Sequence, residues 1–150
     1  YEAILPDAPI VRIMPNTPAL VNEGISALCF NENVDEIDKE FALKFMQNCG
    51  NVIATTEDKI DVITALSGSG PAFYFELIHL LAKSAQKLGL DYKDAILLSA
   101  QTALGSAKML IENEFKVDPF YCINNSIKVL EPHLLVPNYL RDTEAERNLK

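Results

Sequence analysis

The chain has 150 residues, and its 21 acidic side chains outnumber its 13 basic ones, which gives a formal net charge of −8. This acidic balance argues against a nucleic-acid or anionic-membrane surface, because both need clustered Lys and Arg. At 49% apolar residues, the chain can bury a core, and its length suits one domain or the remains of two. We recognise no signal peptide and no run near the roughly 20 apolar residues that cross a bilayer.

The cysteines do not suggest a metal site. The chain has three cysteines, an odd number: Cys29, Cys49 and Cys122. They lie far apart in sequence and form neither a C-x-x-C pair nor a metal-binding pattern with histidine. We therefore expect buried free thiols, no metal ion and a reducing cytoplasm.

The first third of the chain has the pattern of an α/β layer. Apolar residues recur at every fourth position from Ile37 through Phe41 to Phe45, which predicts a helix over residues 35–48. Gly50 follows this helix and suits a left-handed cap. Short runs rich in Val, Ile and aromatic residues predict three strands, at residues 10–14, 25–30 and 51–55.

From Glu57 onward the pattern favours helices. Pro71 suits the first position of a long helix, and Gly89 suits its end. The opening turns of this helix are apolar on nearly every side, so we expect a second subunit to cover them. A shorter helix at residues 58–66 precedes it and a longer one at residues 91–114 follows.

A stiff polar turn follows the first predicted strand. Pro15 and Pro18 bracket Asn16 and Thr17, so the backbone is restrained where two short polar side chains leave a strand. Ligands of open α/β sheets bind at the carboxyl ends of strands, which makes this turn a candidate binding element. An ordinary proline-rich turn explains the same residues, and both interpretations remain open.

A glycine-rich segment leads into the Pro71 helix. As a loop it would offer free backbone N–H groups and the positive end of a helix dipole to a carboxylate or phosphate. It has neither the Gly-Lys-Ser/Thr of a P-loop nor the third glycine of a dinucleotide fingerprint. Alternatively, its glycines let two helices cross closely. The segment comprises Ser67, Gly68, Ser69, Gly70, Pro71 and Ala72.

The histidines do not indicate a catalytic base. His79 lies in the apolar helix, where a hydrogen-bonded core residue is expected, and His133 has no evident partner. No Ser-His-Asp set or spaced carboxylate pair stands out, so hydrolytic and metal-assisted chemistry gain no support and no catalytic residue is assigned.

Three longer strings, taken in order, resemble pyrroline-5-carboxylate reductase. They are V-R-I-M-P-N-T-P-A-L-V at residues 11–21, D-V-I-T-A-L-S-G-S-G-P-A at residues 61–72 and A-Q-T-A-L-G-S-A-K-M-L at residues 100–110. The resemblance implies a mostly α fold with a small α/β remnant. Residues 1–56 would be the end of a Rossmann-type dinucleotide-binding domain, and residues 57–150 a helical dimerisation and substrate domain.

The resemblance also implies a function. Members of that family make L-proline, in the last step of proline biosynthesis, by delivering hydride from NADH or NADPH to the imine carbon of 1-pyrroline-5-carboxylate. A homodimer or larger homo-oligomer in the cytoplasm is expected. By residue match, the nicotinamide would lie beside Met14, Pro15, Asn16 and Thr17, and the substrate near Ser67, Gly68, Ser69, Gly70 and Pro71.

Two departures from the family pattern matter. The glycine fingerprint of the family's cofactor domain is not found in the 150 residues, so we expect this chain alone to be inactive. The family's Pro-Gly-Gly-Thr loop, which grips the substrate carboxylate, is missing or replaced near residues 121–126. Asn125 and Ser126 are the candidates to replace its donors, and the tail from about residue 117 is atypical.

Two other functions remain open. One is a non-catalytic dimerisation or regulatory module derived from the same family, which a start codon directly before Tyr1 would favour over the enzyme. The other is the helical domain of a different imine or β-hydroxyacid reductase. The sequence argues against this second alternative, because Met-Pro-Asn-Thr-Pro and Ser-Gly-Ser-Gly-Pro-Ala occur here together.

Overall fold

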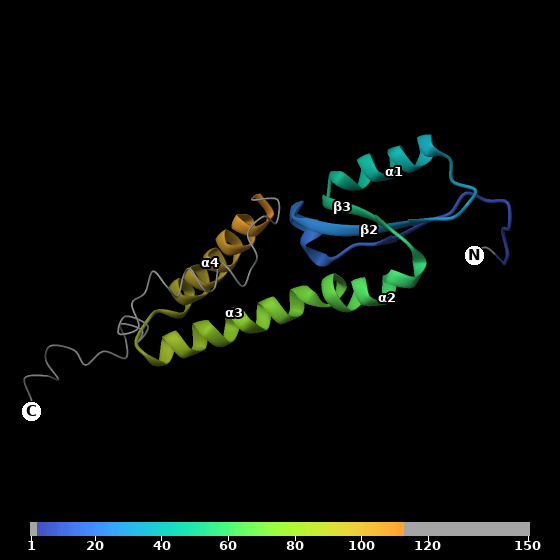
Figure 1. The fold of residues 1–150 in the computed structure, drawn as a ribbon. Helices are drawn as coiled ribbons and strands as arrows, with labels where there is room; N and C mark the ends of the chain where they lie inside the picture. The colour runs from blue at the N-terminus through green and yellow to red at the C-terminus, as the bar shows by residue number, and fades with distance from the viewer. Residues whose placement is uncertain (1–2, 113–150) are drawn as a thin grey trace, which may run out of the picture. The chain divides into compact units, whose positions relative to one another are not determined.

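The structure is a computed structural model and describes residues 3–112 (Figure 1). The predictions for the tail, including those for Asn125, Ser126, Cys122 and His133, lie outside these residues. The chain divides into two compact units, residues 1–95 and 96–150, and each is described by itself.

A small mixed sheet forms the α/β part. Strands β1 (Val11–Met14), β2 (Gly24–Phe30) and β3 (Gly50–Thr55) lie in the order β1-β2-β3. Strand β1 is antiparallel to β2, and β2 is parallel to β3. Helix α1 (Glu36–Gln47) connects the two parallel strands, as a parallel pair requires. The three predicted strands and the helix between them are therefore confirmed.

The two ends of α1 are built differently. At its start Asp35 caps the helix, because its Oδ1 accepts a hydrogen bond from the N–H of Asp38 at 2.8 Å. At its end the helix stops at Asn48 in a right-handed conformation. The predicted left-handed glycine cap is wrong: Gly50, with φ of +131°, begins β3, and a side chain there would collide with the backbone of Gly24.

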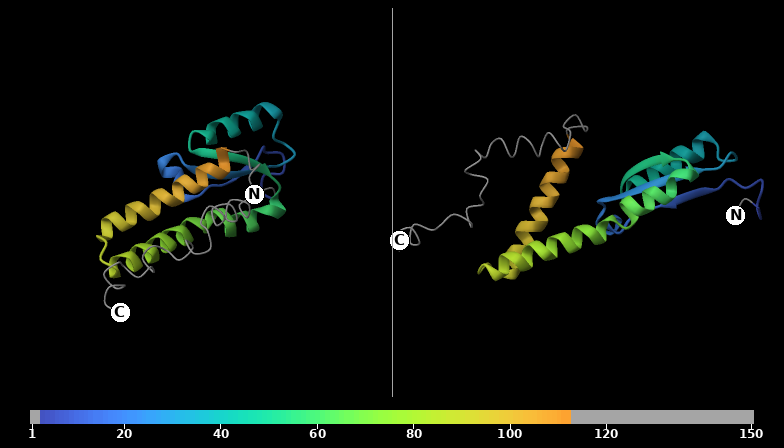
Figure 2. Two further views of the ribbon diagram at one scale, coloured as in Figure 1. Left: turned by 60° about the vertical axis from the view of Figure 1, so that its left-hand side comes forward. Right: turned by 60° about the horizontal axis from the view of Figure 1, so that its bottom comes forward.

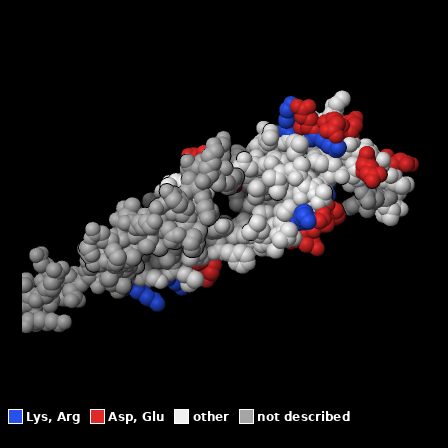
Figure 3. Space-filling view, in the orientation of Figure 1, with Lys and Arg blue, Asp and Glu red and all other residues white. Residues whose placement is uncertain are grey.

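The apolar repeat of α1 does not face the sheet. Ile37, Phe41 and Phe45 are 78%, 68% and 62% exposed, and the two phenyl rings stack with centroids 6.2 Å apart. The neighbouring residues Leu43 and Met46 are half-buried instead. Charged side chains also gather over this helix (Figure 3). The repeat thus predicts the helix correctly, but within residues 3–112 it forms a surface stripe.

The sheet is covered on both faces, by α1 on one side and by helix α2 (Ile60–Ile63) on the other (Figures 1 and 2). Ala27 and Cys29 of β2 are buried against Ile60, and Met14 and Ile63 pack on them. Successive strand residues point to opposite faces, so the fully buried Leu28 lies on the α1 side. The strand β2 is thus the centre of the core.

From Glu57 the chain is helical without the break that the glycines suggest. A 3-10 turn, η2 (Glu57–Lys59), leads into α2, and a π-helical turn, η3 (Thr64–Gly68), joins α2 to helix α3 (Gly70–Lys87). The expectation of a loop at residues 67–70 is therefore wrong. The helix predicted from Pro71 is confirmed, since Pro71 lies in its first turn.

Helix α4 (Tyr92–Glu112) follows Gly89, whose φ of +99° marks the turn after α3. The expected helix over residues 91–114 is confirmed up to the last described residue. On α3, the described residues leave an apolar stripe exposed, whereas Ala82 is buried. This stripe comprises Phe73, Leu77, Leu80 and Leu81.

Between residues 3 and 112, no helix is long and apolar enough to cross a membrane. The same range contains no group of His, Cys, Asp and Glu that could hold a metal ion. Cys29 and Cys49 are free thiols. The division at residues 56 and 57 and the cytoplasmic location stay predictions.

Candidate functional site

The polar turn after β1 is locked to the sheet. Met14 ends the strand, and Asn16 precedes the short 3-10 helix η1 (Thr17–Val21) in an extended conformation. The Oδ1 atom of Asn16 accepts a hydrogen bond at 3.0 Å from the N–H of Ile25, at the start of β2. Pro15 and Thr17 are exposed beside it. The side chain of Asn16 thus holds the turn in place and keeps its amide nitrogen as a donor.

The segment at residues 67–71 is a braced helical turn. The hydroxyl groups of Thr64 and Ser67 donate to the carbonyls of Ile60 and Ile63, at 2.8 and 3.0 Å. The N–H of Ser69 donates to the carbonyl of Thr64 at 2.9 Å, which closes the π-helical turn. The expected row of free N–H groups is therefore wrong. Among the described residues, the exposed Ser69 makes no side-chain hydrogen bond. Within the segment of residues 67–71, its hydroxyl is therefore the side-chain donor that a ligand could use.

The structure brings the two segments together. A Cβ added at Gly68 would lie 2.6 Å from Cε of Met14, so the Met14 methyl group occupies the space that this glycine leaves open. A Cβ at Gly70 would meet nothing within 4 Å. Among the described residues no second helix crosses at these glycines, because the neighbour of Gly68 comes from a strand.

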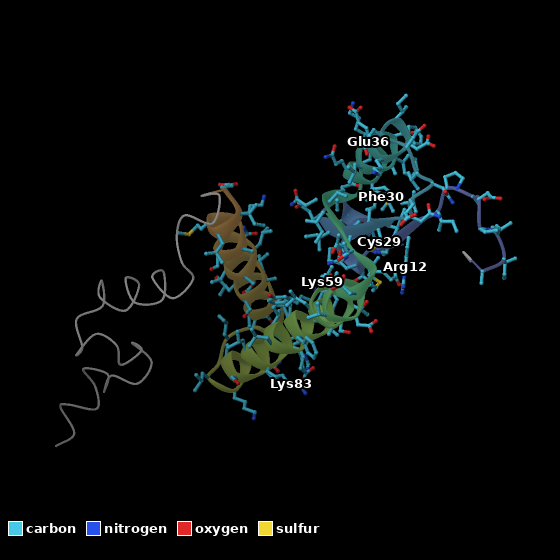
Figure 4. All side chains as sticks on the ribbon, turned by 45° about the vertical axis from the view of Figure 1, so that its right-hand side comes forward. Arg12, Cys29, Phe30, Glu36, Lys59 and Lys83 are labelled. Atoms are coloured by element: carbon cyan, nitrogen blue, oxygen red, sulfur yellow. The ribbon has the colours of Figure 1, made fainter. Side chains whose placement is uncertain are left out.

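The thiol of Cys29 is buried in the core cluster on which Met14 packs. Burial raises its pKa, and Asp58 adds to the rise, while the guanidinium of Arg12 acts against it. Arg12 on β1 forms an ion pair with Glu57 at the start of η2. Figure 4 shows Arg12, Cys29 and Lys59 close together where β3 leads into α2. The thiol is therefore held neutral, and the ion pair joins β1 to the segment that leaves the sheet.

A hollow elsewhere on the α/β part does not contain either segment. Its volume is about 1080 Å³, and it lies at the amino end of β1, between Ile10, Phe30 and Thr55. None of the predicted site residues lines it. The candidate site is instead the surface around the Met14–Gly68 contact.

His79 is structural, as expected. Its Nδ1 atom lies 2.8 Å from the hydroxyl of Tyr92, and the two half-buried rings meet edge to face. This hydrogen bond joins α3 to the start of α4. Within the described chain it gives His79 a partner other than a substrate.

Sequence reasoning missed the π-helical turn. Thr64 and Ser67 each follow, by four positions, the residue whose carbonyl they bond. That spacing is the one at which Ser and Thr hydroxyls bond back along a helix, so it could have indicated that the helix continues through the glycines.

Comparison with known proteins gives a consistent result. Residues 57–121 match the family model described as pyrroline-5-carboxylate reductase dimerisation. The chain is 40% identical over 111 residues to pyrroline-5-carboxylate reductase of Methanosarcina acetivorans, across 74% of this chain and 41% of that protein. The Pseudomonas aeruginosa reductase is 42% identical over 107 residues, across 71% of this chain and 39% of that protein.

The chain is related to pyrroline-5-carboxylate reductases.

Solved structures agree with this relationship. A Coxiella burnetii pyrroline-5-carboxylate reductase matches with a TM-score of 0.68 and 39% identity, over 95% of this chain and 56% of that one. A Plasmodium falciparum pyrroline carboxylate reductase with NADP bound matches with a TM-score of 0.75 and 32% identity, over 95% and 55%. These matches support the mostly α fold, with the end of a Rossmann-type domain followed by a helical dimerisation domain. The chain spans about two fifths of the curated relatives.

Proposed function

We propose that the protein containing this chain reduces 1-pyrroline-5-carboxylate to L-proline with NADPH or NADH, the last step of proline biosynthesis. The observation that carries the proposal is the contact between Met14 and Gly68, because it joins the segments that family resemblance assigns to cofactor and substrate. The two residues are far apart in sequence, and both belong to strings that carry the resemblance to the family. Their proximity is what a hydride transfer between two bound molecules requires.

The turn after β1 suits the nicotinamide end of a dinucleotide. Thr17 offers an exposed hydroxyl, and the amide nitrogen of Asn16 remains a donor while its oxygen anchors the turn. When bound, the reduced nicotinamide supplies the hydride. The residues at this turn fix orientation only, because the described chain has no glycine fingerprint to hold the pyrophosphate.

The start of α3 suits a small carboxylate. Ser69 is exposed directly before α3, and its hydroxyl makes no hydrogen bond among the described residues, so it can donate to a carboxylate oxygen. Ser67, in contrast, already donates its hydroxyl proton to Ile63 and can only accept a further hydrogen bond. We therefore assign substrate contact to Ser69 ahead of Ser67, within the segment of residues 67–71.

We also propose that the chain assembles with a second copy through the helices after residue 57. The exposed stripe of α3 is apolar, whereas the exposed face of a helix in water is usually polar. The family model that matches this part of the chain also describes dimerisation. A dimer would bury apolar side chains that are exposed among the described residues.

The experiment is a reductase assay of the protein expressed from its full coding sequence, with 1-pyrroline-5-carboxylate and either cofactor. We expect oxidation of the cofactor and formation of L-proline in equal amounts. Ser69→Ala should raise the KM for the imine substrate more than Ser67→Ala does, which makes the two serines a matched pair.

A polypeptide of these 150 residues alone should turn over at the background rate. A folded full-length protein with no turnover would contradict the proposed enzyme and favour a non-catalytic dimerisation module. Equal effects of the two serine substitutions would contradict the assignment of Ser69.

A further inference from the structure

The side chain of Met14 lies between two anchored parts of the molecule. Met14 packs on the buried cluster of Ala27, Cys29 and Ile60, and two residues later Asn16 is tied to the start of β2. The backbone on the β1 side of the contact is therefore held by the sheet.

The other side of the contact is equally restrained. Gly68 ends the π-helical turn, which is braced by the Thr64 and Ser67 hydroxyl groups and closed by the N–H of Ser69. A Cβ at Gly68 would also lie 3.5 Å from Cγ2 of Thr64, so the space there is filled from both sides. The flexible end of Met14 is consequently the part that yields when this space is reduced.

We propose that Met14 is a positioning residue that couples the cofactor segment, residues 14–17, to the substrate segment, residues 67–71. The inference rests on the proposed function. A methyl group added at Gly68 displaces the end of a flexible side chain and not the backbone, so it changes the cofactor segment at little cost in folding. Because the Met14 methyl group fills the space beside Gly68, a change at Met14 alters the substrate segment as well.

The test is a double-mutant cycle on the protein expressed from its full coding sequence. Gly68→Ala should raise the KM for NADPH by about fivefold or more, the lower end of typical coupling between sites, although residue 68 belongs to the substrate segment. In a Met14→Leu background, which lacks the Cε atom, the same substitution should change that KM much less.

Gly105→Ala is the matched control. It adds the same methyl group on α4 where nothing lies within 4 Å, so its effect should be additive with that of Met14→Leu. Thermal unfolding of each variant separates a folding defect from a binding one.

Each outcome decides the inference. Absence of turnover in the wild type would overturn the proposed function and this inference with it. Turnover together with additive effects of Gly68→Ala and Met14→Leu would overturn the coupling alone. If Gly68→Ala does not fold, Met14→Leu decides, since we expect a several-fold change in the KM for 1-pyrroline-5-carboxylate and an unchanged value would overturn the coupling.

Discussion

At the residue scale, Cys29 links the core to the solution pH. The residue is only 6% exposed and clusters with Ala27 and Ile60, so the charged thiolate is disfavoured in the folded state. Burial is the main cause of the raised pKa, and Asp58 acts in the same direction. A thiol in the unfolded chain ionises near its ordinary value of 9.0.

We predict that this thiol contributes a loss of stability in alkali. Well below pH 9.0 both states keep the proton, so the pH has no effect through this group. As the pH rises further, the unfolded chain releases its proton first, and the free energy of unfolding falls until the pH passes the raised pKa of the folded state. Urea unfolding measured from pH 8 to about pH 11 should show a smaller decline in Cys29→Ala than in the wild type.

Cys49→Ala is the control for this measurement. Cys49 is half-buried and is not part of the core cluster, so it tests whether any lost cysteine would give the same result. An equal flattening in both variants would show that burial of Cys29 is not the cause. Lysine and tyrosine side chains also titrate in this range, which is why the comparison is between variants.

At the element scale, the start of α1 depends on one side chain. The carboxylate of Asp35 accepts the N–H of Asp38 at 2.8 Å, and it also stands at the positive end of the helix dipole. We predict that Asp35→Ala lowers the free energy of unfolding by about 1 kcal/mol, the usual value for a lost cap.

Asp35→Asn separates the capping hydrogen bond from the effect of the charge. Both Asp35 variants are compared with the wild type by urea unfolding. The amide oxygen keeps the capping hydrogen bond but loses the charge, so its stability should lie between those of the wild type and Asp35→Ala. Glu32→Ala, an exposed change before the helix, should leave stability within about 0.5 kcal/mol of the wild type. A loss in Glu32→Ala as large as that in Asp35→Ala would contradict the capping argument.

The positions of the helices and strands were predictable from local patterns, whereas the face that each helix packs against the sheet was not. Periodicity located α1, but the residues that define it, Phe41 and Phe45, point away from the sheet. A repeat fixes which residues share a face and does not say which face the sheet covers. Here the less regular set around Leu43 and Met46 packs inward.

The same limit applies to the candidate site. Its segments were found from proline and glycine patterns, but glycines in a sequence indicate a break and not the partner that fills the space. Gly68 continues a helix because Thr64 and Ser67 bond back along it, and Met14 fills the gap at its surface. That contact joins residues distant in sequence, so no local pattern could have predicted it.

At the scale of the whole molecule, we compare two of the apolar stripes that the described residues expose as possible interfaces. One lies on α3, around Phe73 and Leu77, and the other lies on α1, around Phe41. The family model that matches residues 57–121 includes α3 and excludes α1. We therefore expect the interface between copies on α3, because a contiguous apolar stripe indicates a partner and only the α3 stripe lies in the segment that matches the dimerisation model.

The last prediction separates the two stripes by sedimentation of the protein expressed from its full coding sequence. Leu77→Glu should shift the protein toward the monomer, because it buries an unpaired carboxylate in an apolar interface. Phe41→Glu makes the same kind of change on α1 and should leave the assembly intact. Lys83→Glu, on α3 outside the stripe of Phe73, Leu77, Leu80 and Leu81, tests whether added negative charge alone disrupts it. Dissociation by Phe41→Glu without dissociation by Leu77→Glu would move the interface to α1, and the exposed side of α3 would then need another partner.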